Sequence, residues 1–266
     1  MNNGVAVRRR GRRLVRGVIR KIVRGAAVPF RYLPESPAKE AIKVALLKID
    51  NNLPYALHVN AGETAIQVGT PNPRTMIEYS RAVGARGRVI IIEAEPDNVE
   101  RLRRAFPALP YRNVTIVAKG AWSAKGRLPL LLSPHSGDHK FAVPGISHDN
   151  DYRPENTYER SIDVQVDTLD SIVRAEGLAR VDFVSITVNG AEMEVLKGAD
   201  EVLARRGLRL WVKGHPRQAD GRPINEAIIA LLSARGFTAH RTAGEPAVGA
   251  HPRWRVREGD VYAFKF

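Results

Sequence analysis

The stretch Gly87-Arg-Val-Ile-Ile-Ile-Glu93-Ala-Glu-Pro-Asp-Asn98 decides the fold. Its four consecutive β-branched residues, 89–92, predict a strand buried on both faces, as in a parallel sheet covered by helices. The acidic Glu93 ends this strand. Pro96 and Asp97 then favour a helix start, because proline suits the first helical position and a carboxylate is stabilised near the positive helix end.

A shorter apolar strand, Ala65-Ile-Gln-Val-Gly69, lies upstream and ends in glycine. In open α/β sheets a glycine after the first strand lets a ligand approach the backbone, and an acid after the second binds a ribose diol. Gly69 and Glu93 together therefore predict nucleotide binding at the carboxyl edge of the sheet. Taken alone, Gly69 favours an ordinary turn before a helix capped by Asn72. The spacing is not GxGxxG, so a dinucleotide fingerprint is not supported.

The composition sets limits on the chemistry. The chain has 266 residues and no cysteine, which excludes disulfides, thiolate nucleophiles and cysteine-based metal sites. No apolar run approaches the roughly 20 residues of a membrane span. The basic N-terminus lacks the unbroken apolar core of a signal peptide, so we expect a cytoplasmic protein.

The net charge of +14 is concentrated in the first 31 residues. Ten of the 42 basic residues lie there, with no acidic residue, which leaves 32 basic and 28 acidic residues in the remainder. The main domain is therefore only mildly basic. The strong positive charge therefore indicates what residues 1–31 bind, and not the chemistry of the main domain.

The tail, residues 1–31, contains an amphipathic helical pattern at 12–24. Its apolar positions are Leu14, Val15, Val18, Ile19, Ile22 and Val23, with arginine and lysine elsewhere around the helix. Three interpretations remain: an in-plane anchor on an anionic membrane, an arm that binds nucleic acid, and a helix packed on protein. The apolar stripe favours membrane or packing over RNA, since no aromatic residues are interleaved to stack on bases.

A helical linker is predicted for residues 32–62 and the main domain for 63–266. Within that domain, strands are expected at 65–69, 88–93, 113–118, 182–187, 208–213 and 261–265. Helices are expected at 73–83, 97–106, 168–176, 190–205 and 223–235. This alternation predicts a doubly wound, mostly parallel α/β sheet with helices on both faces. An insertion at 125–166 carries two further strands around a polar segment at 133–158, which is long enough for a lid or binding loop.

Five segments then carry a family resemblance. They are 66–69, 87–98, 113–117 with 121–123, 166–170 and 181–199. In this order they resemble the FkbM-type family of S-adenosylmethionine-dependent methyltransferases, over most of residues 64–215. The last segment is the most specific, because it is similar to that family's "KIDVEGAE…VLKGA" block. The resemblance implies a Rossmann-like methyltransferase fold, with S-adenosylmethionine as cofactor.

The resemblance also implies site roles. Gly69 borders the methionine part of the cofactor, next to Gln67, which stands at an acidic position of the family. Glu93 holds the ribose, and Trp122 and Ser123 lie near the adenine. The family further implies O-methylation of a hydroxyl, commonly on a sugar or natural product.

The departures from the family pattern share one chemical trend, the loss of acidic side chains. Four acidic positions are neutral or basic here, and they are occupied by Gln67, Thr187, Asn189 and Lys213; in addition Pro73 replaces a glycine and Ser185 a lysine. Carboxylates favour the sulfonium and ammonium groups of the cofactor, so their replacement removes attraction. Thr187, Asn189 and Lys213 also make a poor divalent-cation site, and no metal is predicted.

Methyl transfer relies on positioning, but a hydroxyl acceptor must still lose its proton, usually to a histidine. We therefore select His215, after the strand at 208–213, together with Thr187 and Asn189, as candidate catalytic residues. A structural histidine before Pro216 is an equally good interpretation of His215. The insertion also holds His135, His139 and His148; nearby Pro134 and Gly137 disfavour a helix, so solvated loop residues are expected rather than a zinc site.

The leading hypothesis is an O-methyltransferase held near a membrane surface, acting on a small-molecule or glycan acceptor. A catalytically lapsed member that serves as a binding or scaffold module is the second hypothesis. An RNA-directed methyltransferase recruited by the tail is the third. The sequence does not identify the acceptor.

Overall fold

The computed structural model describes residues 18, 21–23, 25, 29–50, 55–70, 72–147, 157–214, 216–218, 220–246, 256–257 and 259–266. His215, His148 and most of the predicted tail lie outside these residues. Among the described residues, no helix combines the length and apolar character needed to cross a bilayer.

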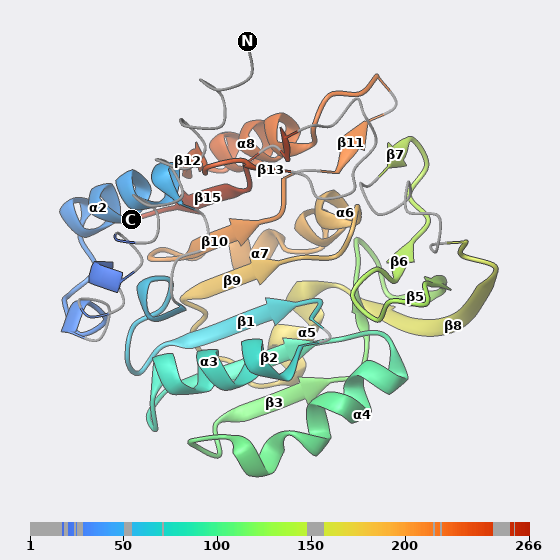
Figure 1. Cartoon of the computed structure of the whole chain (residues 1–266), viewed down its shortest axis with the longest axis horizontal. Coiled ribbons are helices and arrows are strands. Elements are labelled where there is room, and N and C mark those ends of the chain that lie inside the picture. Colours follow the sequence, from blue (N-terminus) through green and yellow to red (C-terminus); the bar gives the residue numbers. More distant parts are fainter. Residues whose placement is uncertain are drawn as a thin grey trace.

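A seven-stranded sheet forms the centre of the molecule, in the order β12-β15-β10-β9-β1-β2-β3 (Figure 1). The strands are β1 Thr64–Val68, β2 Arg88–Ile92, β3 Val114–Val117, β9 Phe183–Ile186, β10 Arg209–Val212, β12 Thr238–Arg241 and β15 Val261–Phe264. All neighbours from β10 to β3 pair in parallel, and only β15 runs antiparallel to β10 and β12. The predicted mostly parallel sheet is confirmed.

Successive side chains of each strand point to opposite faces of the sheet, and a layer of helices covers each face. Val89 and Ile91 pack on one layer, and Ile90 and Ile92 on the other. The first layer holds α2 Pro37–Ile49, α3 Pro73–Val83 and α4 Pro96–Arg104; the second holds α5 Leu169–Ala175, α6 Glu192–Lys197, α7 Asp200–Leu203 and α8 Asn225–Ala234. Helices therefore cover both faces, as predicted for a doubly wound sheet.

The range predicted as a linker, 32–62, packs against the sheet through α2. Val44 and Leu47 are buried in the first layer. The buried Glu40 accepts a hydrogen bond from the Tyr262 hydroxyl, at 2.8 Å, and pairs with Lys43. These contacts hold α2 against β15, although the two elements lie near opposite ends of the sequence.

The insertion forms a second sheet, in the order β4-β8-β5-β6, beyond the carboxyl ends of β1 and β9 (Figure 1). Its strands are β4 Gly120–Ala121, β5 Gly126–Leu132, β6 Lys140–Phe141 and β8 Arg160–Asp167. Smaller pieces are β7 Ile146–Ser147, β11 Arg217–Gln218, β13 Glu245–Pro246, β14 Val256–Arg257, η1 Tyr55–Leu57 and η2 Phe106–Ala108. We call residues 133–141, from the end of β5 through β6, the strap.

The structure differs from the prediction at two elements. The single helix expected at 190–205 is divided into α6 and α7 around Gly198. A Cβ atom on Gly198 would lie 2.1 Å from the backbone oxygen of Trp122, so this close approach requires glycine. The edge strand β12 was not predicted, because its residues Thr238–Arg241 show no buried apolar pattern.

Candidate functional site

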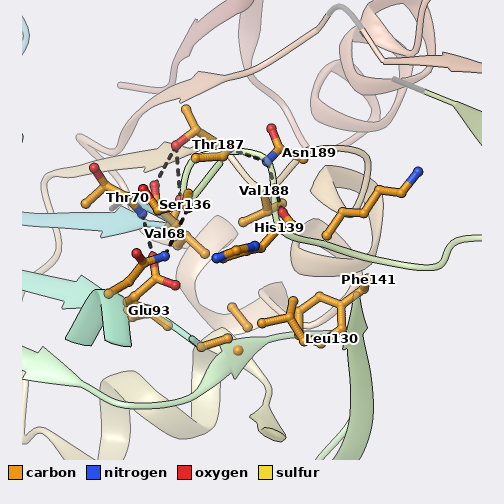
Figure 2. A pocket seen from close by; sticks show the side chains of 18 residues that line it. Val68, Thr70, Glu93, Leu130, Ser136, His139, Phe141, Thr187, Val188 and Asn189 are labelled. Carbon is orange, nitrogen blue, oxygen red and sulfur yellow. Dashed lines mark hydrogen bonds between the residues drawn. The ribbon is translucent and has the colours of Figure 1, made fainter. Parts of the chain in front are cut away.

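A pocket lies where the carboxyl ends of β1, β2 and β9 meet (Figure 2). Chain order reverses here, since the strands run outward from β1 to β3 and then resume at β9 on the other side of β1. Such switch points are the usual ligand sites of open α/β sheets. Four of the predicted site residues line the pocket: Gly69, Glu93, Thr187 and Asn189.

Glu93 binds two loops of the pocket at once. Its Oε2 accepts the backbone N–H of Thr70 and its Oε1 that of Glu95, each at 3.0 Å. Burial raises the pKa of this carboxyl, and the two backbone N–H groups act in the opposite direction. Each carboxylate oxygen keeps a lone pair, so Glu93 can still accept hydrogen bonds from a ligand diol.

Gln67 and Thr187 are engaged in the turn after β1. The Gln67 amide donates to the Thr187 hydroxyl at 3.0 Å, and both side chains donate to the backbone oxygen of Gly69, at 2.9 and 2.7 Å. Gly69 has φ +73°, and a Cβ there would lie 2.5 Å from the Thr187 backbone oxygen. Glycine is therefore required by packing, whether or not a ligand binds. In this arrangement Gln67 and Thr187 position the turn.

Asn189 connects the sheet to the strap. Its side-chain amide donates to the backbone oxygens of Gly137 and His139, at 2.8 and 3.0 Å (Figure 2). Lys213 fixes its orientation by donating to the Asn189 Oδ1 at 3.0 Å. Thr187 thus lies against Gly69, and Lys213 contacts Asn189, at the carboxyl ends of neighbouring parallel strands.

The loop that carries Asn189 has an unusual backbone. Asn189 and Gly190 have φ +54° and +110°. The fully buried Glu192 supports this loop, because its carboxylate accepts the backbone N–H groups of Val188, at 3.2 Å, and Gly190, at 2.9 Å. Burial raises the pKa of Glu192 to about 7, and Lys213 acts against that rise.

The strap places His139 inside the pocket. Figure 2 shows its ring between Glu93 on one side and Leu130 and Phe141 on the other. A second amide, Asn98, binds the strap on the far side by donating to the Ser136 oxygen at 3.1 Å. The expectation that His139 is a solvated loop residue is wrong, because the half-buried ring lies among pocket residues.

A backbone contact fixes the protonation of His139. The backbone N–H of Ser133 donates to the His139 Nδ1 at 3.0 Å, so the ring proton of the neutral form resides on Nε2. Burial lowers the pKa of His139, although Glu95 and Asp138 act in the opposite direction. With the strap in this position, His139 is therefore a neutral hydrogen-bond donor.

The strap leaves little room in the pocket. The free volume is about 60 Å³. This volume holds a few water molecules, whereas pockets for ligands of cofactor size span roughly 300 Å³ or more. In this structure the pocket is therefore smaller than a nucleoside requires.

Other predicted site residues lie elsewhere. Trp122 packs edge-on against Phe141, with ring centroids 5.3 Å apart, and is not a pocket-lining residue. Ser123 donates to Glu194 at 2.7 Å, also away from the pocket. His215 lies outside the described residues. Within the described part of the chain, no group of three or more acidic or histidine side chains could hold a metal ion.

Several pocket residues were not predicted as site residues. They are Thr70, Asn98, Ser136, Gly137, His139, Lys140 and Phe141. The length of segment 133–158 predicted a lid or binding loop, but no motif links the strap to the loop around Asn189, about 50 residues away. Tertiary packing alone brings them together.

Comparison with known proteins identifies the family. A model of the FkbM methyltransferase domain matches residues 67–239. No curated protein matches the chain.

Among solved structures, the chain is similar to the FkbM methyltransferase of Methylobacillus flagellatus KT, with 15% identity, 93% of this chain and 60% of that chain covered, and a TM-score of 0.49. It is also similar to Aeropyrum pernix fibrillarin with S-adenosyl-L-methionine bound, with 16% identity, coverage of 84% and 74%, and a TM-score of 0.46. The chain spans only 60% of the length of that FkbM structure. Because the family model covers more than half of the chain, the protein belongs to the FkbM methyltransferase family, with a Rossmann-like methyltransferase fold.

Proposed function

We propose that the protein transfers a methyl group from S-adenosylmethionine to an alcohol oxygen. The observation that carries this proposal is Glu93, an acid at the end of β2, which lines a pocket at the switch point between β1 and β9. Membership of the FkbM family supports it. When bound, the cofactor supplies an electrophilic methyl group on a sulfonium.

The residues present fit one part of the cofactor well. The Glu93 carboxylate suits a ribose diol, and the turn at Gly69 is rigidly held by Gln67 and Thr187. The positively charged part has weaker support, since Asn189 and Lys213 offer an amide and an ammonium instead of carboxylates. Binding energy must therefore come mainly from the nucleoside.

The acceptor hydroxyl needs a base, and the closed strap does not supply one. Thr187 and Asn189 do not take a proton near neutral pH, and Nδ1 of His139 is occupied by the Ser133 N–H. His139 becomes a base at Nε2 only after that contact breaks and its proton moves to Nδ1. We therefore assign proton removal to His139 in an open strap, or to His215.

Calorimetric titration with S-adenosylhomocysteine tests the proposal. We expect saturable binding to one site, followed by methyl transfer from labelled S-adenosylmethionine to an alcohol. A lapsed binding module is the second candidate, favoured by the roughly 60 Å³ pocket and by the exchanged acids. Absence of S-adenosylhomocysteine binding, with the fold intact, would support that second candidate.

The contact between Asn189 and the strap gives a prediction that does not depend on the cofactor. Asn189→Gly keeps the positive φ without strain and removes two hydrogen bonds to the strap. At roughly 0.5–1.5 kcal/mol each, their loss should raise strap opening about 5- to 150-fold. Amide hydrogen exchange at residues 133–141 measures this.

Asn113→Ala is the matched control for that experiment. Asn113 also donates to two backbone oxygens, those of Ser80 and Gly84, but it lies at the opposite edge of the sheet, before β3. Strap exchange should be unchanged in this variant. Equal strap exchange in wild type and Asn189→Gly would contradict the role given to Asn189.

The tail gives a separate proposal, an anionic membrane surface as partner. Two of its predicted stripe residues, Val18 and Ile22, are 52% and 66% exposed, whereas Val23 is buried in the first helical layer. One side of the stripe thus packs on protein while another remains available. Apolar insertion beside arginine and lysine favours anionic lipid, at about 1 kcal/mol per basic residue.

Co-sedimentation with vesicles checks this proposal. We expect the chain to bind anionic vesicles, to bind neutral ones weakly, and to lose binding in high salt. Deletion of residues 1–20 should abolish binding and leave the main domain folded, since Val23 and α2 are retained. Equal binding to both vesicle types would contradict the membrane hypothesis, and a gel shift with RNA that depends on the tail would favour the RNA-directed alternative.

A further inference from the structure

A second cavity adjoins the cofactor pocket. Its volume is about 230 Å³, and it lies between the end of the strap, the segment 142–147 and the loop at Asn189 and Gly190. Lys140, Phe141 and Asn189 line both cavities. The two cavities are therefore adjacent, with Asn189 between them.

The position of this cavity matches that of an acceptor. In the proposed function, the ribose lies on Glu93 and the methionine portion near Gly69. Glu93 and Gly69 line only the first cavity, whereas Asn189, next to Thr187 at the end of β9, lines both. The second cavity thus extends from the side of the pocket that these two groups leave open.

The lining of the second cavity is mainly apolar. Its apolar side chains are Leu131, Phe141, Ala142, Val143, Pro144 and Ile146. Among the described lining residues, Lys140 is the only charged one, and none is a carboxylate, tyrosine or tryptophan. A sugar ring here would bury several hydroxyls with few partners, and a buried hydroxyl without a hydrogen-bond partner is unfavourable.

The volume limits the size of the group. A dry cavity of about 150 Å³ lined by leucine, isoleucine and phenylalanine accommodates benzene. The second cavity is open on one side, where Ala142 and Pro144 are exposed, so its volume of about 230 Å³ sets an upper limit of roughly ten carbon atoms for an apolar group. We propose that this cavity binds the apolar body of the acceptor, an alkyl or aromatic group within that limit, and directs its hydroxyl past Asn189 into the cofactor pocket.

This inference rests on the proposed function and gives the acceptor class, an amphiphilic alcohol rather than a free sugar. Alkyl β-D-glucosides test it, because methyl, butyl, hexyl and octyl members share one sugar and differ only in the chain. Calorimetry on the full chain, below micellar concentrations, should show affinity rising roughly fourfold per methylene up to about eight carbons. Equal affinity for the methyl and octyl members would overturn the inference.

Polar substitutions locate the binding. Val143→Thr with Ile146→Thr adds two hydroxyls to the cavity wall and should lower octyl glucoside affinity about tenfold. The matched control is Ile22→Thr on the tail helix, where the side chain is 66% exposed. If the control removes the chain-length dependence while the cavity variant retains it, the alkyl chain binds the tail and the inference is wrong.

Titration of the same preparations with S-adenosylhomocysteine separates the two proposals. A chain-length dependence without S-adenosylhomocysteine binding keeps the apolar cavity and rejects the methyltransferase function. S-adenosylhomocysteine binding with no chain-length dependence rejects the cavity assignment and leaves the proposed function intact. The wild-type series stands by itself if the cavity variant does not fold.

Discussion

Replacing Glu93 by alanine is expected to weaken S-adenosylhomocysteine binding roughly 5- to 150-fold, the scale of one charge-assisted hydrogen bond worth about 1–3 kcal/mol. The variant also leaves the backbone N–H groups of Thr70 and Glu95 without their acceptor. Both groups lie in a buried region, so the free energy of unfolding should fall by about 2–4 kcal/mol. Calorimetry and urea unfolding measure the two effects separately.

Glu95→Ala is the control that distinguishes these two effects. Glu95 is also a buried carboxylate, and it accepts the backbone N–H groups of Asp97 and Asn98 at the start of α4. It is not a pocket-lining residue, so its loss should cost stability, about 1 kcal/mol for a helix cap, with little change in affinity. Equal loss of affinity in both variants would mean that Glu93 acts only by holding the loops.

The parallel sheet could be predicted because each central strand is a local run of apolar residues. Residues 89–92 are apolar at every position, which suits only a strand covered on both faces, and α3 begins at Pro73 after the cap Asn72 as expected. Elements whose identity depends on distant contacts were less predictable. The break at Gly198 is caused by the backbone of Trp122, which lies far away in the sequence.

The site residues that directly follow strands could be predicted, whereas those of the strap could not. Gly69, Glu93, Thr187 and Asn189 each follow a buried strand, so the topology of a parallel sheet places them at one edge. The position of His139 depends instead on how a 133–141 loop folds back over that edge, and no periodicity records such a contact. Its hydrogen bonds to Ser133 and Asn189 become visible only in three dimensions.

These contacts suggest one reason why amides stand at two positions where the family resemblance implies acids. An amide at 67 donates to the turn oxygen of Gly69, and an amide at 189 donates to two strap oxygens. A carboxylate cannot donate either set of hydrogen bonds when ionised. Two substitutions that remove attraction for a cationic cofactor therefore also add hydrogen bonds, Gln67 to the turn at Gly69 and Asn189 to the strap.

Glu192 should make the stability of the protein depend on pH near neutrality. Burial raises its pKa to about 7 from an ordinary value of 4.5. Between these values the folded protein holds the proton and the unfolded chain does not, so the free energy of unfolding falls as pH rises through this window. The shift corresponds to about 3 kcal/mol, and the loss is complete above pH 7 or so.

Glu192→Gln removes this titration, so the difference in unfolding free energy between wild type and variant should decrease by about 3 kcal/mol from pH 4.5 to 8. Urea unfolding across that range measures it.

Glu194→Gln, two residues away, serves as a control of opposite sign. Burial acts to raise the pKa of Glu194, but hydrogen bonds from Lys197 and Ser123 outweigh it and hold the pKa below its usual value. Its contribution is therefore lost as pH falls below the ordinary range of a glutamate. Parallel stability curves for wild type and Glu192→Gln would show that folding leaves the pKa of Glu192 unshifted, because the two backbone N–H groups that it accepts offset its burial.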